Sequence, residues 1–256
     1  MEIIIQPNAE MAAQTVADVI AQALLAEPRV VLGLATGLTM QPVYDQLVRK
    51  HHEDGLDFSR CSTFNLDEYI GLAADDPRSY HYFMRHHFFD RVNIDLRHTH
   101  LPDGMASDLE AEGAYYETLI ARNGGIDLQI LGIGLNGHIG FNEPDSAFDS
   151  RTRVQALSRA TRAQNAPLFP APAQVPREAI TMGIGTILEA RQCLLLATGL
   201  EKAEIVSKAL EGPVTAAVTA TALQLHPNST IVLDKAAASR LQKTDPYRET
   251  PVPKPE

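Results

Sequence analysis

Short, mainly apolar runs alternate along the chain with longer stretches in which apolar residues recur at helical spacing. A short apolar run that ends at a turn signal is typical of a buried strand, and recurrence every three to four positions is typical of a helix. The runs predict strands at 3–5, 30–34, 61–66, 128–131, 179–184, 192–197 and 231–233. The stretches between them predict helices at 8–27, 41–50, 79–90, 108–122, 185–190, from 198 onward and at 219–225. The pattern therefore indicates strands alternating with helices.

The length of the chain limits the number of domains. With 256 residues it can bury about three quarters of the surface that its unfolded form exposes. It suits one α/β domain or two small ones, and a single domain over residues 1–243 is the simpler expectation, since no internal repeat is visible. Residues 244–256 are polar and rich in proline, so we expect a mobile C-terminal tail there.

The charge of the chain limits its partners. There are 22 basic and 32 acidic residues, which give a formal net charge of −10, and neither sign is concentrated in one block. Such a surface attracts neither nucleic acid nor an anionic membrane, so we expect neither as a partner. An anionic small substrate would instead need a local pocket of N–H groups with one or two cations.

Cysteine usage and the N-terminus bear on the compartment. Cys61 and Cys193 each lie at the start of a predicted strand and are expected to be reduced core thiols. The first residues lack the basic and apolar regions of a secretory signal, and no apolar run approaches the roughly 20 residues that cross a bilayer. We therefore expect a cytoplasmic protein.

The segment LGIGLNGHIGFNEP at 131–144 concentrates the candidate chemistry. Its glycines at 132, 134 and 137 spell GxGxxG after a strand, which is the dinucleotide-binding fingerprint. That fingerprint also needs a helix directly after it and an acidic residue about 20 positions on. Neither is present, and Pro144 bars the residue before it from helical geometry. We therefore interpret the glycines as allowing backbone N–H groups to approach a ligand closely.

His138 and Glu143 in this segment form a candidate acid–base pair. Imidazole has the side-chain pKa nearest neutrality, and a carboxylate bonded to its second nitrogen would fix the tautomer and stabilise the imidazolium. The alternative is a histidine packed at a strand end with a solvated Glu143. The glycine-rich surroundings favour the base and its orienting carboxylate.

Three other segments carry ambiguous signals of a binding site. Residues 35–39 join a predicted strand to a helix, as in a phosphate-binding loop, but a tight connection would look the same. Asp67 follows a strand, where open α/β sheets bind ligands, but it could equally serve as a helix N-cap. Lys202 opens a helix, a position that either serves a bound anion or is simply solvated.

Histidines at 81, 86 and 87 raise the question of a metal site. No cysteine or carboxylate ligands stand at matching spacing, and adjacent histidines point to different faces of a helix. A packed aromatic helix is therefore expected, with no metal. Arg151 and Arg153 lie on either a solvated face or an anion contact, and the proline-rich residues 164–176 are expected to form a loop without regular structure.

Several segments together resemble the glucosamine-6-phosphate deaminase family. They are LGLATGLTMQPVY at 32–44, TFNLDEYIGL at 63–72, GIGLNGHIGFNEP at 132–144, SRTRV at 150–154 and LQLHP at 223–227, in the family's order along nearly the whole chain. The resemblance implies a single α/β domain with a Rossmann-like, mostly parallel sheet and helices on both faces. It also implies conversion of glucosamine 6-phosphate and water to fructose 6-phosphate and ammonia, without metal or cofactor. The partner is then a small-molecule sugar phosphate, and a homo-oligomer stays possible.

The resemblance assigns roles by position. His138, oriented by Glu143 and assisted by Asn136, would open the sugar ring, and Asp67 would move a proton from carbon 2 to carbon 1. The substrate and its phosphate would be bound by Thr36, Gly37, Leu38, Thr39, Gly137 and Lys202.

Three positions depart from the family's pattern. Leu38 stands where a small residue is usual in the phosphate loop, and Pro167 stands where an arginine usually binds the phosphate. Loss of that charge-assisted bond should weaken phosphate binding unless another cation compensates, and the candidates are Arg159, Arg162 and Arg177.

In some relatives an arginine and a lysine bind an N-acetylated sugar-phosphate activator. By the resemblance Arg153 matches that arginine, and the third departure is Gln155, which stands in place of the lysine. We therefore predict weak or absent activation of that kind. Two alternatives remain open at this point: action on another sugar phosphate, as in galactosamine-6-phosphate deaminases or 6-phosphogluconolactonases, and a non-catalytic sugar-phosphate sensor.

Overall fold

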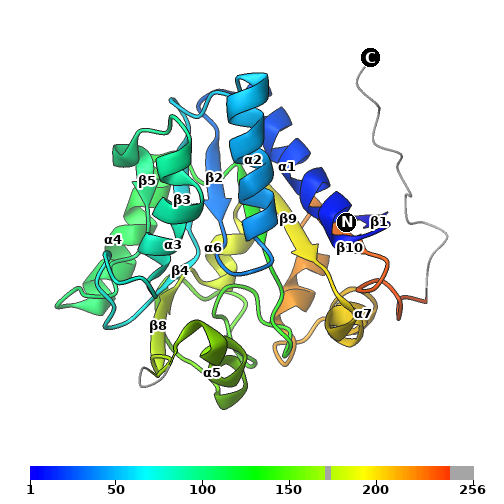
Figure 1. Cartoon of the computed structure of the whole chain (residues 1–256). Coiled ribbons are helices and arrows are strands. Elements are labelled where there is room, and N and C mark those ends of the chain that lie inside the picture. Colours follow the sequence, from blue (N-terminus) through cyan, green and yellow to red (C-terminus); the bar gives the residue numbers. More distant parts are fainter. Residues whose placement is uncertain (171–173, 243–256) are drawn as a thin grey trace.

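A seven-stranded parallel sheet forms the centre of the molecule (Figure 1). The structure is a computed structural model that describes residues 1–170 and 174–242, so the expected tail at 244–256 lies outside the described residues. The strand order is β1-β10-β9-β6-β2-β3-β5, and every neighbouring pair is parallel. The strands are β1 (Glu2–Gln6), β2 (Val31–Leu34), β3 (Ser62–Asn65), β5 (Thr99–His100), β6 (Leu128–Leu131), β9 (Gln192–Ala197) and β10 (Ser229–Asp234). The expected Rossmann-like fold is confirmed.

Helices connect these strands and cover the sheet, with α1 and α2 in front of it in Figure 1. They are α1 (Ala9–Ala26), α2 (Gln41–Asp54), α3 (Tyr80–His87), α4 (Leu109–Arg122), α6 (Ile184–Leu188) and α7 (Ala203–Glu211), with 3-10 turns η1 (Phe89–Arg91), η2 (Leu96–His98), η4 (Leu200–Lys202) and η5 (Thr219–Leu225). Side chains of Asn8, Ser79 and Asp108 cap α1, α3 and α4 by accepting a backbone N–H bond. Gly55, in the left-handed conformation, ends α2.

A second, three-stranded antiparallel sheet adjoins the carboxyl end of the first. It consists of β4 (Asp67–Tyr69), β8 (Glu178–Thr181) and β7 (Arg153–Ala156), in that order. The alternative of Asp67 as a helix N-cap is therefore wrong, because this residue begins β4. The strand expected at 179–184 is also shorter than predicted, since Gly183 already serves as the N-cap of α6.

The expectation of no regular structure over 164–176 is wrong for its first residues. Helix α5 (Arg159–Asn165) and the 3-10 turn η3 (Ala166–Leu168) occupy them. Ser158 starts this helix, because its hydroxyl accepts a bond from the backbone N–H of Thr161 at 3.1 Å. Residues 171–173 lie outside the part of the chain that is described.

Each sheet has its own cluster of buried apolar side chains. The larger cluster surrounds the parallel sheet, and the smaller one lies beside the antiparallel sheet and contains Tyr69, Tyr80, Phe141 and Phe169. Leu101 packs against both. Cys61 and Cys193 belong to the larger cluster and are free thiols, as predicted.

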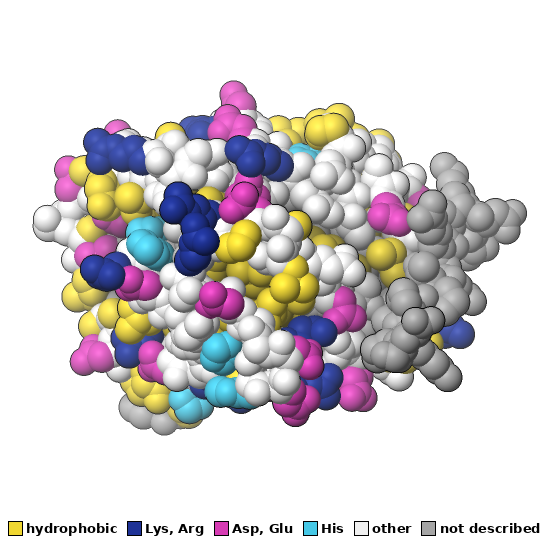
Figure 2. Space-filling model, turned by 90° about the horizontal axis from the view of Figure 1, so that it is seen from above, with side chains coloured by type: hydrophobic (Ala, Val, Ile, Leu, Met, Phe, Trp, Pro, Cys, Tyr) yellow, Lys and Arg dark blue, Asp and Glu magenta, His cyan; other side chains and the backbone are white. Residues whose placement is uncertain are grey.

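The surface shows no large area of one charge on the face at the amino ends of the strands. Acidic, basic and uncharged side chains are interspersed there (Figure 2). Among the described residues, no helix combines the length and the apolar character that crossing a membrane requires.

Candidate active site

A cavity of about 390 Å³ opens at the carboxyl ends of the parallel strands. Its walls come from the loops after β2, β3, β6 and β9, together with α5 and η3. Open α/β sheets bind their ligands at this edge, and the volume suits a small metabolite. Of the residues predicted for the site, the cavity is lined by Thr36, Gly37, Leu38, Thr39, Asp67, His138 and Lys202.

The loop from Thr36 to Thr39 is built to receive an anion. Gly37 has a positive φ of 105°, which turns the chain between β2 and α2. Within the described residues, the backbone N–H groups of Gly37, Leu38 and Thr39 find no hydrogen-bond acceptor. Helix α2 has no acidic residue in its first turn and no side-chain cap. Free N–H groups beside the positive end of a 14-residue helix favour a bound phosphate.

Lys202 supplies a cation at the opposite wall of the cavity. It lies in η4, is 9% exposed, and its Nζ donates to the carbonyl oxygen of Ile133 at 2.7 Å. Burial lowers its pKa, and the charge of Glu201 opposes that effect. The lysine is thus held in place by the backbone of the glycine-rich loop, with donors to spare for a ligand.

The imidazole of His138 stands on the glycine-rich loop and reaches the cavity. A Cβ added to Gly134 would come within 2.3 Å of the ring, so only glycine permits this position. Burial lowers the pKa of His138 to about 4, although the charge of Glu143 acts in the opposite direction. The ring is therefore neutral at physiological pH and can both accept and donate a proton.

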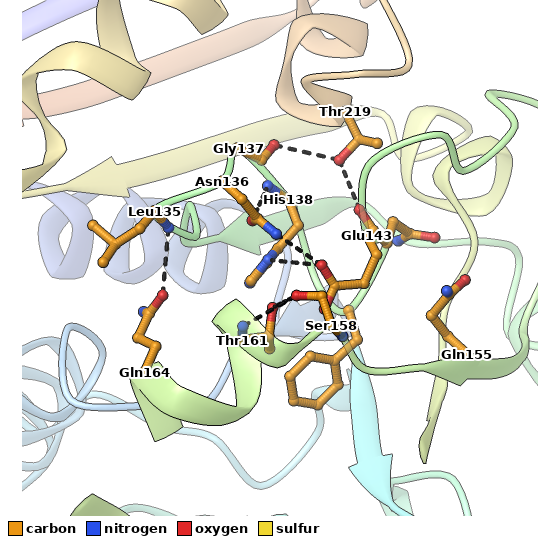
Figure 3. Close-up of polar contacts among 12 residues, drawn as sticks. Leu135, Asn136, Gly137, His138, Glu143, Gln155, Ser158, Thr161, Gln164 and Thr219 are labelled. Atoms are coloured by element: carbon orange, nitrogen blue, oxygen red, sulfur yellow. Dashed lines mark hydrogen bonds and ion pairs between the residues drawn. The ribbon is translucent and has the colours of Figure 1, made fainter. Parts of the chain in front are cut away.

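Glu143 lies behind the imidazole, away from the cavity lining (Figure 3). Its Oε2 is 4.0 Å from Nδ1 of His138, and it accepts a bond of 2.7 Å from the side-chain amide of Asn136. Its Oε1 accepts the backbone N–H of Ser158 at 2.9 Å. Burial raises the pKa of Glu143, but bonds from Thr161 and Ser158 and the nearby His138 outweigh it, so the pKa is lowered. An ionised carboxylate is thereby held beside the imidazole.

Asp67 brings a second carboxyl group to the cavity from β4. It is 6% exposed, and its pKa is raised to about 8, first by burial and then by the charge of the adjacent Glu68. Gly140, with a φ of 55°, packs closely enough that an added Cβ would stand 3.5 Å from Oδ2 of Asp67. The predicted convergence of Asp67 and the histidine segment on one cavity is thus observed.

Like Glu143, three further residues of the glycine-rich segment are absent from the cavity lining: Asn136, Gly137 and Asn142. Gly137 donates its N–H to Gly134 and accepts from the N–H of Ala220, and an added Cβ would stand 2.6 Å from Val218. Its predicted contact with the substrate therefore has no geometric support. Asn142 is buried and donates to the carbonyl oxygen of Met182 at 2.8 Å, so it fixes the loop.

The candidate replacements for the missing arginine also lie off the cavity lining. Arg159 and Arg177 are exposed. Arg162 is partly buried on α5, and its Nε is buried without a hydrogen-bond partner within the described residues. Among the three, only Arg162 belongs to α5, the helix that contributes Gln164 and Asn165 to the cavity wall.

Sequence reasoning missed several residues that form this wall. Tyr80 of α3 lines the cavity, and so do Gln164 and Asn165 of α5. Asn165 donates to the hydroxyl of Tyr69 at 2.8 Å, and Gln164 accepts the N–H of Leu135 at 3.4 Å (Figure 3). These bonds hold α5 across the mouth of the cavity, and no spacing in the sequence signals them.

No three His, Cys, Asp or Glu side chains among residues 1–170 and 174–242 gather as they would around a metal ion. His81 contacts Glu68, and His87 lies 3.3 Å from the amide of Gln41. The histidines of α3 thus have neighbours of their own within the protein.

Fold and cavity together define a Rossmann-like α/β protein with an anion-binding cavity that also holds two groups able to transfer protons. The chain belongs to the family of glucosamine-6-phosphate isomerases and 6-phosphogluconolactonases, whose sequence model matches residues 6–232.

Relatives within this family resemble the chain over almost its full length. The glucosamine-6-phosphate deaminase of Rhodopirellula baltica is 52% identical over 243 residues, which are 95% of this chain and 97% of the relative. The glucosamine-6-phosphate deaminase of Arthrobacter sp. is 48% identical over 255 residues, which are 100% of this chain and 98% of the relative.

Solved structures of two proteins also resemble this chain. A monomeric glucosamine-6-phosphate deaminase superposes with a TM-score of 0.92 at 45% identity, covering 94% of this chain and 100% of the other. A 6-phosphogluconolactonase from Trypanosoma brucei superposes with a TM-score of 0.74, covering 94% of this chain and 98% of the other. At 22% identity this likeness concerns the fold alone.

Proposed function

We propose that the protein is a glucosamine-6-phosphate deaminase, which converts glucosamine 6-phosphate and water to fructose 6-phosphate and ammonia. One observation carries the proposal: a neutral imidazole and a separate buried carboxyl group face one cavity that also offers free N–H groups and a lysine. The proton-transfer groups suit an isomerisation, and the anion-binding groups suit a phosphate. The high identity to named deaminases supports the same assignment.

Ring opening is the first step, and it falls to His138. The imidazole takes the proton from the anomeric hydroxyl and returns it to the ring oxygen as the bond between carbon 1 and that oxygen breaks. During the transfer the ring carries a positive charge, which the ionised Glu143, 4.0 Å from Nδ1, stabilises. Asn136 holds Glu143 through its amide bond and so acts as a positioning residue.

Isomerisation and deamination follow at Asp67. Its carboxylate takes the proton from carbon 2 and returns it to carbon 1, while a second proton passes from the amino group to the carbonyl oxygen. The amino aldehyde thereby becomes a ketose imine. Water adds to the imine carbon and ammonia leaves, so that fructose 6-phosphate remains. A group whose pKa is about 8 can exist in both protonation states near neutrality, as an acid–base catalyst must.

Phosphate binding rests on Thr36, Gly37, Leu38 and Thr39 with Lys202. The loop offers backbone donors at the start of α2, and the lysine offers charge. Backbone donors do not depend on the side chain, so Leu38 can serve as well as a smaller residue. The position of Pro167 leaves Lys202 as the one cation that lines the cavity within the described residues.

Ammonia release from glucosamine 6-phosphate tests the proposal, with the galacto epimer and 6-phosphogluconolactone as alternative substrates. We expect ammonia and fructose 6-phosphate in equal amounts from the gluco sugar. Faster release of ammonia from the galacto epimer would identify that epimer as the preferred substrate. Hydrolysis of the lactone without release of ammonia would identify the protein as a lactonase. Binding of the amino sugar without any turnover would make it a sensor.

A cytoplasmic location is part of the proposal. The buried thiols Cys61 and Cys193 are unpaired, and burial raises the pKa of each to about 12. Unpaired core thiols suit a reducing compartment.

A further inference from the structure

Glu68 is a fully buried carboxyl group beside Asp67 that the proposed reaction does not use. Its exposed fraction is 0%. Successive side chains of a strand point to opposite faces, so on β4 the cavity receives Asp67 while Glu68 points away from it. An isolated buried charge is costly, and such a residue persists only where its neighbours satisfy it.

Four N–H contacts satisfy this carboxyl group. Its Oε1 accepts the backbone N–H of Tyr69 at 2.8 Å and that of Tyr80 at 3.0 Å. Its Oε2 accepts the backbone N–H of His81 at 2.9 Å and lies 2.8 Å from the ring Nδ1 of the same residue. Three of these donors are backbone groups, so Glu68 serves as an acceptor for the chain that surrounds it.

Two of those donors belong to the first turn of α3. The start of a helix leaves its backbone N–H groups without partners, and a carboxylate there also interacts favourably with the helix dipole. Glu68 therefore fixes, together with the Ser79 cap, where α3 begins. This placement sets the ring of Tyr80 in the cavity wall, with its hydroxyl 3.4 Å from that of Tyr69.

The same carboxyl group acts on Asp67 through its charge. The titratable groups that interact with Asp67 are Glu68 and Tyr69 on β4, Tyr80 on α3 and Tyr116 on α4. Burial raises the pKa of each tyrosine far above neutrality, so these groups carry no charge. Glu68 is the one neighbour of this set that can bear a negative charge near Asp67.

We propose that Glu68 is a positioning residue of this active site: it anchors α3 and Tyr80 and keeps a negative charge behind Asp67, so that Asp67 retains an abstracted proton long enough to return it to carbon 1. The proposal rests on the proposed function for its second half. Without Glu68, Asp67 would be a weaker base and a stronger acid, and the return of the proton to carbon 1 would compete with loss to solvent.

The test is the titration of Asp67 in the free, full-length protein, followed by NMR of carboxyl-labelled aspartate and assigned with Asp67→Asn. In Glu68→Gln the midpoint should fall by about one pH unit or more, because a like charge has been removed. Glu178→Gln is the matched control, since it removes an exposed carboxylate from β8 of the same sheet. An unchanged midpoint in Glu68→Gln overturns the proposal.

Catalysis provides a second readout. The acidic limb of the kcat/KM profile should move to lower pH in Glu68→Gln and stay in place in Glu68→Asp, which keeps the charge. A loss of kcat in both variants with no movement of the limb would leave only a structural role and overturn the electrostatic half. If Glu68→Gln does not fold, Glu68→Asp takes its place in the titration. Because this variant keeps the charge, a midpoint for Asp67 more than one pH unit from that of the wild type would overturn the electrostatic half.

These readouts also separate this proposal from the proposed function. The NMR titration needs no substrate, so it stands even if the wild-type protein releases no ammonia.

Discussion

The two halves of the cavity differ in how far they depart from the family's pattern. The half that is proposed to move protons keeps His138, Glu143 and Asp67. The two carboxyl groups are buried, and the imidazole side chain is 12% exposed. The half that is proposed to receive the phosphate has an exposed Leu38 and an exposed Pro167. Proton transfer needs particular functional groups at particular places, whereas an anion can be held by any suitably placed N–H groups.

The contrast has a simple physical basis. Replacing a buried carboxyl or imidazole removes both the chemistry and the acceptors or donors that neighbours depend on. A substitution in the loop between β2 and α2 leaves the backbone donors and the helix dipole in place. The phosphate half should therefore tolerate change, and the proton half should not.

The strongest test of the contrast is Asp67→Asn. The amide cannot take a proton from carbon 2, so kcat should fall by about 10²–10⁴-fold. Exchange of the carbon-2 proton with solvent deuterium, followed by NMR, should stop, while calorimetry should show unchanged sugar binding. Exchange at the wild-type rate would remove Asp67 from its role.

Lys202→Met tests the phosphate half. Loss of a buried charge-assisted bond costs about 1.5–3 kcal/mol, so KM should rise by about tenfold or more with a smaller change in kcat. Lys208→Met is the matched control, because Lys208 pairs with Glu204 in an exposed ion pair on α7. A fall in kcat alone, with KM unaltered, would contradict a binding role for Lys202.

Pro167→Arg should lower KM, whereas Lys202→Met should raise it. Pro167 lines the cavity at the start of η3, and an arginine there could add a charge-assisted bond to the phosphate. We expect KM to fall several-fold in steady-state kinetics, and Pro167→Gln, which removes the proline without adding charge, to leave it unchanged. Equal effects of the two variants would show that the family's missing arginine is already replaced in this chain.

The smallest effect is expected from N-acetylglucosamine 6-phosphate as an added activator. Arg153 donates to Asn142 at 2.9 Å, to Ser146 at 3.1 Å and to Gln155 at 2.9 Å, so its guanidinium is already bonded within the protein. Initial rates at low substrate should stay the same with and without the compound. A lowered KM would mean that this arginine leaves its partners for the effector.

Most of the parallel sheet could be predicted because β2, β6, β9 and β10 are buried on both faces and so appear as short apolar runs. Of the antiparallel sheet, only β8 could be predicted in this way. Strand β4 has three residues, two of them acidic, and it pairs with β8, a segment more than a hundred positions later. Such pairing leaves no periodic pattern within either segment, and Asp67 could therefore be mistaken for a cap.

The site was predictable to the extent that its residues lie in compact motifs. His138, Glu143, Asp67 and the loop from Thr36 to Thr39 were found in this way. Gly137 was expected at the ligand because glycines in such motifs often are, but its N–H and carbonyl bind neighbouring backbone.

Helix α5 was missed because the prolines that follow it dominated the pattern. Its own start signal is a single serine, Ser158, whose hydroxyl caps the first turn. Once α5 is in place, Gln164 and Asn165 come to the cavity wall, and Glu143 gains the N–H of Ser158.

The buried carboxyl of Asp67 also bears on resistance to heat. Its folded pKa of about 8 lies above the ordinary aspartate value of 3.8, so this group makes the empty protein less stable as the pH rises from 4 to 8, and the loss is complete above 8. The melting temperature of the empty protein should therefore be lower at pH 9 than at pH 6, so that alkalinity by itself weakens this fold.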